Sequence, residues 1–273
     1  MKKRILIFTG IALVMLSLLT GLNSCNPNCP NPTTVHDTLY VHDTTHLHDT
    51  ANCINCYNAV GCYPFSGNAN DVSGNNLNGT VIGATLTTDR HGNANSAYYF
   101  NKSYTTRIEL PSLSNFDNTN DFSISFWAKT DNVAGYGTTI LSDEPNVSSD
   151  RFQININYSG SPVNTNIFDY GNISGGGRLV SPASSVVFST WEHYVFVKSS
   201  TGNFMKIYKN GAEIATKAGV STKSNKSKII VVGGSPANTE HGDQFFKGSL
   251  DDLKIFNRAL TVAEVTQIYN AER

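Results

Sequence analysis

The sequence predicts an all-β protein, an antiparallel sandwich of two sheets followed by one short C-terminal helix. Composition is the first reason, because 31 Asn, 26 Thr, 27 Ser and 22 Gly stand against 7 Glu and 3 Met, which favours strands and turns over helices. The second reason is that short strand-like runs alternate with turn clusters from Tyr57 onward. No composition break divides this region, so we expect one domain over residues 57–273.

Bulk composition also excludes some classes of protein. Hydrophobic residues make up 39% of the chain, too many for a disordered protein and enough for one sizeable core. The chain has 20 Lys and Arg against 21 Asp and Glu, so it lacks the basic excess of a typical nucleic-acid binder. We therefore expect no nucleic-acid partner.

Alternating apolar and polar residues locate the strands. Ser96–Phe100 and Thr106–Leu110 are expected to form a strand pair. Trp191–Lys198 is apolar on both faces, as a central strand would be, which assigns Trp191 to the core. The other expected strands are Asp121–Thr130, Arg151–Tyr158, Lys228–Val232 and Leu250–Phe256.

Two local signals are stronger than the rest. Asn210-Gly211 lies between the expected strands Met205–Tyr208 and Glu213–Thr216, which predicts a hairpin with a type I′ turn. Thr261 and Glu264 form a capping box, and apolar residues then recur at helical spacing. We expect this C-terminal helix to pack on the sandwich.

The N-terminus has the features of an export signal. Lys2, Lys3 and Arg4 precede an apolar run that is too short for a comfortable membrane span. The run ends in Leu22-Asn23-Ser24-Cys25, which resembles a bacterial lipobox. We predict a signal peptide over residues 1–24 and a lipid on Cys25, the alternative being an ordinary secretory signal. The protein would then be exported and lipid-anchored in the bacterial cell envelope, at the outer membrane or cell surface.

The cysteine count agrees with this prediction. The chain has five Cys, an odd number that is awkward for an exported protein. Assigning Cys25 to the lipid leaves four thiols that can pair in three ways, and disulfides are the default in an oxidising compartment. A zinc site made by the same thiols is the alternative. The four candidates are Cys29, Cys53, Cys56 and Cys62.

A repeat of period six precedes the domain. Val-His-Asp-Thr, Val-His-Asp-Thr and Leu-His-Asp-Thr begin at Val35, Val41 and Leu47, within a segment that has no Lys or Arg. Repeats six residues apart on an extended strand are separated by roughly 20 Å, too far to share a metal ion. We interpret residues 25–56 as a polar tether, in preference to a metal or proton sensor.

Motifs in the predicted domain then point to a family. In order along the chain they are Tyr63-Pro64-Phe65, Asp71–Gly79, Phe122–Trp127, Trp191-Glu192-His193-Tyr194, Ile207–Gly211 and Phe246–Leu260. In this order and spacing they resemble the laminin-G-like, concanavalin A-like jelly-roll family of bacterial surface proteins. The resemblance covers about residues 57–270. It implies a jelly-roll sandwich and, as in most members, a binding module rather than an enzyme, but it does not identify the ligand.

The carboxylates give little support to catalysis. Retaining glycoside hydrolases of this fold need two carboxyl groups about 5–5.5 Å apart, usually at alternating positions of one strand. The seven Glu form no such array, and Asp251 and Asp252 are adjacent, so they would point to opposite faces. We predict that the protein is not an enzyme.

Calcium is the expected ion. The Asp71–Asn78 loop offers the oxygen donors of Asp71 and Asn75, and the last strand of such sandwiches tends to lie beside the first, which would bring Asp251 and Asp252 near. These four residues form the predicted calcium site. The alternative, which we prefer, is that Asp71 forms an Asx turn and the Asp pair caps local amides.

Four aromatic residues are candidates for ligand binding. Trp127 lies opposite the apolar face of its strand, and Tyr104, Tyr136 and Tyr170 lie in Gly-, Asn- and Ser-rich stretches that we expect to be loops. For Trp127, packing beneath a covering loop is the alternative that we prefer. The predicted function is a non-catalytic envelope module that binds a glycan. The alternatives are a protein-adhesion or structural lipoprotein without a sugar site and, less favoured, a glycoside hydrolase.

Overall fold

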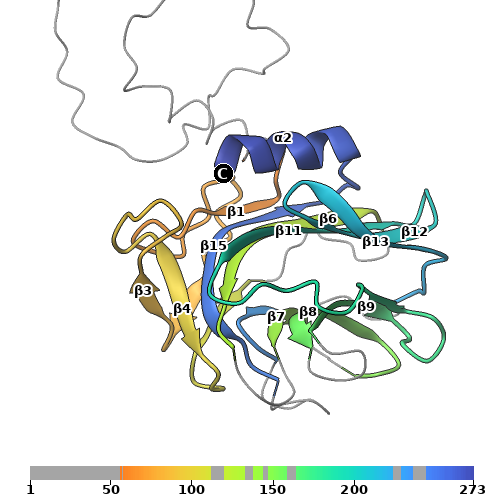
Figure 1. Ribbon diagram of the computed structural model, residues 1–273, viewed down its shortest axis with the longest axis horizontal. Helices are drawn as coiled ribbons and strands as arrows, with labels where there is room; N and C mark the ends of the chain where they lie inside the picture. The colour runs from red at the N-terminus through yellow and green to blue at the C-terminus, as the bar shows by residue number, and fades with distance from the viewer. Residues whose placement is uncertain are drawn as a thin grey trace, which may run out of the picture.

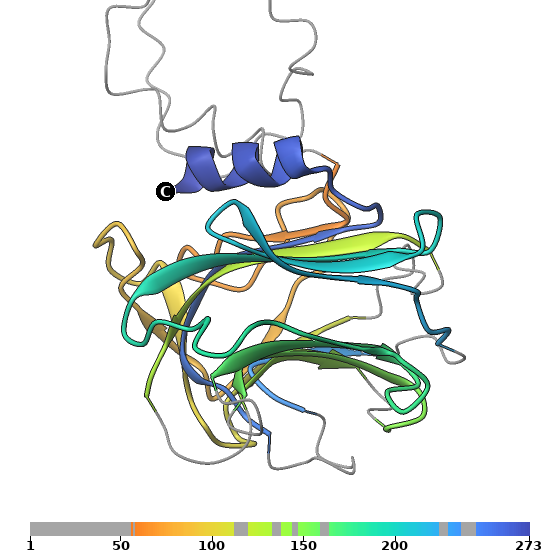
Figure 2. The same ribbon diagram turned by 45° about the vertical axis from the view of Figure 1, so that its right-hand side comes forward.

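Two antiparallel β-sheets pack face to face, and helix α2 (Val262–Glu272) lies across the outer face of one of them (Figures 1 and 2). This computed structural model describes residue 56 and residues 58–111, 120–132, 138–143, 147–158, 164–223, 229–235 and 244–273. The predicted all-β jelly-roll sandwich with a short C-terminal helix is confirmed. The lipobox, most of the tether, and therefore Cys25, Cys29 and Cys53, lie outside the described residues.

The first sheet has the strand order β13-β12-β11-β6-β15-β4-β3, and β1 also pairs with β15. Its strands are β1 (Gly61–Tyr63), β3 (Thr85–Thr87), β4 (Ala97–Asn101), β6 (Phe122–Thr130), β11 (Trp191–Ser199), β12 (Phe204–Lys209), β13 (Ala212–Ala218) and β15 (Lys247–Phe256). The first and last strands, β1 and β15, are therefore adjacent, as expected.

The second sheet has the order β10-β9-β8-β7-β14-β5-β2. Its strands are β2 (Thr80–Ile82), β5 (Arg107–Leu110), β7 (Thr139–Asp143), β8 (Arg151–Tyr158), β9 (Thr165–Gly171), β10 (Arg178–Val180) and β14 (Ile230–Val232). The lower layer of Figure 1 is this sheet, where β7, β8 and β9 are labelled.

The main core lies between the sheets and follows from the alternation of side chains along each strand. Phe122, Ile124 and Phe126 of β6 point into it and are 0–1% exposed. From the second sheet Phe152 and Phe168 meet them, and each ring contacts Phe122 edge-on with centroids 5.6 and 5.9 Å apart. Burial of such aromatic side chains accounts for much of the stability of the sandwich.

The expected pairing of Ser96–Phe100 with Thr106–Leu110 is wrong. Strand β4 pairs with β15 and β3 in the first sheet, whereas β5 pairs with β14 and β2 in the second. The short link between them crosses from one sheet to the other, because Phe100 and Ile108 both face the core from opposite sides. Closeness in sequence therefore predicted a hairpin at a place where the chain passes from one sheet to the other.

The two strong local signals are confirmed. Strands β12 and β13 pair antiparallel, and both residues of the Asn210-Gly211 turn have positive φ, +50° and +80°, as a type I′ turn requires. In α2 the Thr261 side chain accepts from the Glu264 amide, and the Glu264 side chain accepts in return from the Thr261 amide. Both ends of this capping box predicted from the sequence are present.

Helix α2 covers only part of the first sheet. Its residues Val265 and Ile268 pack with Val195, Val197 and Phe256 in a second apolar cluster on the outer face of that sheet. No helix in the described part of the chain is long and apolar enough to cross a membrane. The rest of this outer face, toward β4 and the start of β11, lies beyond the helix.

Candidate functional site

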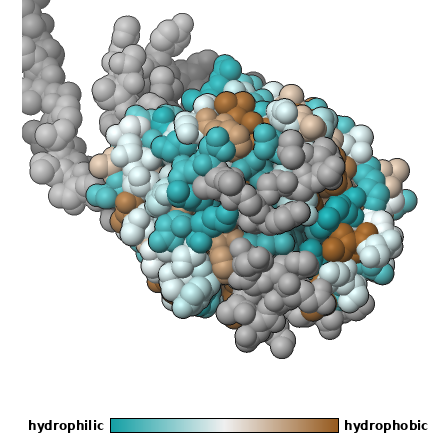
Figure 3. Space-filling view, turned by 60° about the horizontal axis from the view of Figure 1, so that its bottom comes forward, coloured by the Kyte–Doolittle hydropathy of each residue, from teal (hydrophilic) through white to brown (hydrophobic). Residues whose placement is uncertain are grey.

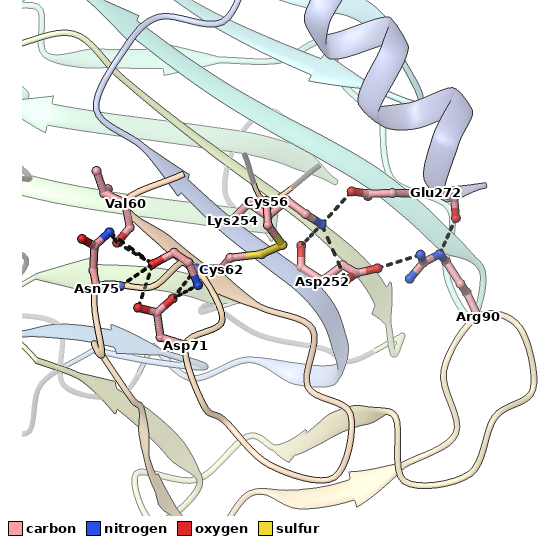
Figure 4. The surroundings of a disulfide bond; sticks show 10 residues. Cys56, Val60, Cys62, Asp71, Asn75, Arg90, Asp252, Lys254 and Glu272 are labelled. Carbon is pink, nitrogen blue, oxygen red and sulfur yellow. Dashed lines mark hydrogen bonds and ion pairs between the residues drawn. A yellow bond between two sulfur atoms is a disulfide. The ribbon is translucent and has the colours of Figure 1, made fainter. Parts of the chain in front are cut away.

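A disulfide joins two of the four candidate cysteines. Cys56 and Cys62 are bonded to each other at the N-terminal boundary of the sandwich, with Cα atoms 5.7 Å apart (Figure 4). Cys62 lies on β1 and is paired in register with Lys254 of β15. The bond therefore ties the incoming chain to the central part of the first sheet.

The predicted calcium loop is closed by hydrogen bonds of its own. Oδ1 of Asp71 accepts from the backbone amides of Cys62 and Ser73, and Oδ2 accepts from the Ser73 hydroxyl and the Leu77 amide, all at 2.8–3.0 Å. The bond to Ser73 two residues on makes this an Asx turn. Asn75 donates through its side chain to the carbonyl of Val60 rather than presenting an oxygen to the loop centre. Both carboxylate oxygens of Asp71 are thus already used.

The other two predicted calcium ligands lie elsewhere. Arg90 donates to Asp251 and to Asp252 through different guanidinium nitrogens, and Lys254 lies 3.6 Å from Asp252. Figure 4 shows Asp71 and Asp252 on opposite sides of the disulfide. The four predicted residues do not converge, and the described residues contain no group of three or more His, Cys, Asp or Glu side chains suited to a metal. The arrangement does not fit a single calcium ion.

Beneath the C-terminus of α2 lies a buried charge cluster made of Arg90, Asp251, Asp252, Lys254 and Glu272. Lys254 Nζ is 2.6 Å from Glu272 Oε1, and the two side chains are 3% and 1% exposed. Arg90 also donates to the backbone carbonyl of Glu272. Burial acts to lower the pKa of Lys254, but the charges of Asp252 and Glu272 outweigh it and raise that pKa. These ion pairs fasten the last turn of the helix to β15.

Trp127 and His193 lie under the same helix. The Trp127 indole, 5% exposed, donates to Glu272 Oε2 at 2.8 Å and stacks on Tyr269. His193 is fully buried and its Nε2 lies 2.8 Å from the Ser125 hydroxyl. Burial, together with the cationic Lys254 and Arg90, lowers the pKa of His193 to about 3. Trp127 is therefore covered, as in the preferred alternative, but by helix α2 and not by the expected loop.

The three candidate tyrosines differ in their surroundings. Tyr104 is 62% exposed in the turn between β4 and β5, where a ligand could reach it. Tyr170 lies on β9 and not in the expected loop; it is 1% exposed, with its ring against Phe122 in the core, so its predicted ligand contact is not supported. Tyr136 lies outside the described residues.

A row of side chains that the sequence did not reveal crosses the uncovered end of the first sheet. Strand register pairs Trp191 with Lys129, Lys129 with Ser249, and Ser249 with Tyr99. All four point to the outer face, because their sequence neighbours Phe100, Ala128 and Leu250 point into the core. We call these four residues, on β11, β6, β15 and β4, the aromatic row.

The aromatic row combines partly exposed rings with polar groups. Trp191 and Tyr99 are both intermediate in exposure, which corrects the assignment of Trp191 to the core. Lys129 Nζ lies 5.3 Å from the centroid of the Trp191 ring, and the Tyr99 hydroxyl donates to Asp131 at 3.1 Å. The end strands of the row, β11 and β4, are three strand spacings apart, about 14 Å. The row can therefore contact an extended ligand.

The outer face of the second sheet is polar but differently built. Gln153 donates to Asn155 and Gln244, and Thr139 donates to Asn155, at 2.6–2.8 Å. These four side chains are 0–9% exposed, so they satisfy one another. Viewed from below the second sheet, teal and pale residues make up most of the described surface, with several separate brown patches (Figure 3). We assign the amide cluster to structure; the aromatic row has no such network of mutual hydrogen bonds among the described residues.

Comparison with known structures reveals folds of the same kind. The binding domain of Paraclostridial Mosquitocidal Protein 1 superposes with a TM-score of 0.58 at 20% identity, over 78% of this chain and 52% of that one. The binding domain of botulinum neurotoxin serotype G gives 0.60 at 19% identity, over 78% and 50%. The chain thus spans about half the length of these toxin domains.

A third structure matches along nearly its whole length. Domain 4 of AbnA, an extracellular GH43 arabinanase from Geobacillus stearothermophilus, was solved in complex with arabinotriose. It superposes with a TM-score of 0.54 at 22% identity, over 77% of this chain and 98% of that one. At these identities the three structures establish the fold alone.

A search of curated proteins found no match, but the sequence does match a family model. A laminin G family model, described as the concanavalin A-like lectin/glucanases superfamily, matches residues 102–266. That match includes β6, β11 and β15, which carry three of the four residues of the aromatic row. Since it covers more than half of the residues, the chain belongs to the concanavalin A-like lectin/glucanases superfamily.

Proposed function

We propose that this protein is a non-catalytic carbohydrate-binding module of the cell envelope, anchored by a lipid on Cys25 and displayed on the tether of residues 25–56. The aromatic row is the observation that carries the proposal. The rings of Trp191 and Tyr99 offer apolar surface to the C–H faces of sugar rings. Lys129, partly exposed between them, offers a donor to sugar oxygens, whereas Ser249 is only 2% exposed.

The extent of the row favours a saccharide chain over a single sugar. Trp191 and Tyr99 stand on strands about 14 Å apart, which one sugar ring cannot span. The exposed Tyr104 follows β4 at the same end of the first sheet and could extend the contact. The arabinotriose complex of the arabinanase domain gives general support, because a sandwich of this fold there accompanies an oligosaccharide.

The charge cluster supports a non-catalytic role. Asp251, Asp252 and Glu272 lie near one another, but Arg90 and Lys254 hold them in ion pairs beneath α2. A glycosidase needs one carboxyl group as acid and a second as base or nucleophile, both open to the substrate. These carboxylates instead hold the helix in place.

A glycan array probed with the full chain tests the proposal. We expect saturable binding to one class of glycan, and Trp191→Ala should weaken it about tenfold, since a stacked ring contributes about 0.5–1.5 kcal/mol beyond its buried area. Phe204→Ala is the matched control, because Phe204 is also a partly buried ring on the first sheet with a lysine, Lys206, 5.1 Å from its centroid. It should leave binding within twofold of wild type.

Three outcomes would contradict the proposal. No saturable glycan signal would favour the protein-adhesion alternative. Equal losses in Trp191→Ala and Phe204→Ala would remove the aromatic row as the binding surface. Release of reducing sugar from a bound glycan would show that the protein is an enzyme.

Calcium binding is tested separately, by measuring the melting temperature in excess calcium and in chelator. An unchanged melting temperature would leave no role for that ion.

A further inference from the structure

Two lysines lie beside each other at the uncovered end of the first sheet. Lys129 is in the aromatic row on β6, and Lys247 begins β15, the next strand. Lys247 points to the same face as Ser249, because Gly248 and Leu250 alternate with them toward the core. Lys129 faces Ser249 directly, so Lys247 is its diagonal neighbour, about 7–8 Å away between Cα atoms.

Neither lysine has an ion-pair partner among the described residues. Both are intermediate in exposure, and Lys129 contacts only the Trp191 ring among the interactions resolved there. Asp131 lies across from Lys247, and its backbone amide donates to the Lys247 carbonyl. Its side chain turns toward the hydroxyl of Tyr99.

The other carboxylates along β15 are held by cations of their own. Asp251, which follows the row on β15, is paired with Arg90, and Asp252 contacts both Arg90 and Lys254. The ammonium groups of Lys129 and Lys247 are therefore two neighbouring cations that these carboxylates do not neutralise. Two neighbouring ammonium groups on one face attract an anion to the space between them.

We infer that the saccharide bound by the aromatic row is acidic, and that Lys129 and Lys247 receive its carboxylate or sulfate groups while Trp191 and Tyr99 contact its ring faces. This inference rests on the proposed function and specifies its substrate class. Ammonium groups bind anions of either kind as point charges, so the geometry does not distinguish the two groups. The experiment below does.

The test compares an acidic saccharide with its uncharged ester, which has the same backbone, and with a sulfated saccharide. The full chain is titrated calorimetrically with an oligogalacturonate, with its methyl-esterified form and with an oligosaccharide whose only charged groups are sulfate groups, at 0.05 and 0.5 M NaCl. We expect the oligogalacturonate or the sulfated probe to bind at least tenfold more tightly than the ester at low salt. This advantage should shrink at high salt, because the screening length falls well below 10 Å.

Variants connect the effect to the two lysines. Lys247→Gln alone, outside the aromatic row, should weaken binding of the acidic probe severalfold and leave binding of the neutral ester within twofold. Adding Lys129→Gln should bring the loss for the acidic probe to about tenfold. Lys217→Gln on the edge strand β13 is the matched control and should change neither. Unchanged melting temperatures would confirm that the variants are folded.

Each outcome has a separate meaning. Preferred binding of the carboxylate or of the sulfate identifies the anionic group. If neutral and acidic probes bind equally, or if the double variant behaves like Lys217→Gln, the inference is overturned while carbohydrate binding stands. If none of the three saccharides binds and the glycan array is also negative, carbohydrate binding itself is refuted and the inference fails with it.

Discussion

Replacing Arg90 by alanine should destabilise the protein strongly. In the structure Arg90 donates to Asp251, to Asp252 and to the Glu272 carbonyl, and its guanidinium lies 4.8 Å from the centroid of the Trp127 ring. The Arg90 side chain is only 9% exposed. Arg90→Ala would leave two carboxylates on β15 without this cation and would uncover the side of the Trp127 ring.

The size of the loss follows from burial. Breaking a buried ion pair by removing one partner costs about 3–5 kcal/mol, because the remaining charge stays desolvated. We expect the free energy of unfolding to fall by about 4 kcal/mol. For a domain of this size that lowers the melting temperature by roughly 8–16 °C. Arg90→Lys should recover part of the loss, since lysine keeps the charge but not the fork that reaches both carboxylates.

The assay is urea unfolding followed by tryptophan fluorescence, to which only Trp127 and Trp191 contribute. Arg258→Ala is the matched control: Arg258 also pairs with a carboxylate, Glu264, and lies 5.6 Å from the Phe256 ring centroid. Because the paired side chains are 39% and 35% exposed, this variant should lose at most about 1 kcal/mol. Equal losses in the two variants would refute the view that α2 is held by a buried charge cluster.

A second check is how the Arg90→Ala deficit, the free energy of unfolding lost relative to wild type, depends on pH. Burial acts to raise the pKa of Asp252, but Lys254 and Arg90 outweigh it and lower that pKa. Such a depressed pKa contributes stability above the pKa of the unfolded chain and loses it as the pH falls. Without Arg90 the carboxylates take up protons at a higher pH, which relieves their unpaired charge. The deficit should therefore be largest near pH 7 and smaller near pH 4.

Two further predictions concern His193 and Gly248. The pKa of buried His193 is lowered to about 3, so below pH 6.5 the unfolded chain binds a proton that the folded chain does not, and the free energy of unfolding should fall by about 2 kcal/mol between pH 6.5 and 5. When the free energy of unfolding is measured by urea titration at several pH values, it should change less with pH in His193→Gln than in wild type. The same pH dependence in both proteins would contradict this. Gly248 has φ +145°, and a Cβ there would meet the Lys129 carbonyl oxygen and the Phe246 ring. Gly248→Ala should lower the free energy of unfolding by more than 2 kcal/mol. Gly219 also has positive φ but has open space around a Cβ, so Gly219→Ala should lower it by about 1 kcal/mol. Similar decreases of the melting temperature in the two variants would show that only backbone strain matters.

The fold was predictable where the signal is local. Alternation along residues 121–130, the Asn-Gly turn and the capping box at Thr261 each specify their structure within a few residues, and all three are present. The pairing of strands was not predictable in the same way. Strands β4 and β5 have the spacing of a hairpin, and only the position of the core between the sheets shows that the chain crosses there.

The site was harder to predict for the same reason. The aromatic row joins residues 99, 129, 191 and 249, and only the register of four strands brings them together. Trp191 stands at the start of an apolar strand, a pattern typical of the core, and nothing local marks it as the partly exposed residue. Conversely, Trp127 has the alternation of a surface residue, and a helix more than 130 residues later covers it.

The division of the first sheet into a covered and an uncovered part connects its stability to its function. Apolar packing of Val265 and Ile268 would by itself allow α2 to slide along the sheet, because such contacts are not directional. Ion pairs and hydrogen bonds are directional, and those at Glu272 end the covered region at Trp127. The next row across the sheet, from Trp191 to Tyr99, is then left open. The buried charge cluster therefore holds the last turn of α2 above Trp127, one row away from the proposed saccharide surface.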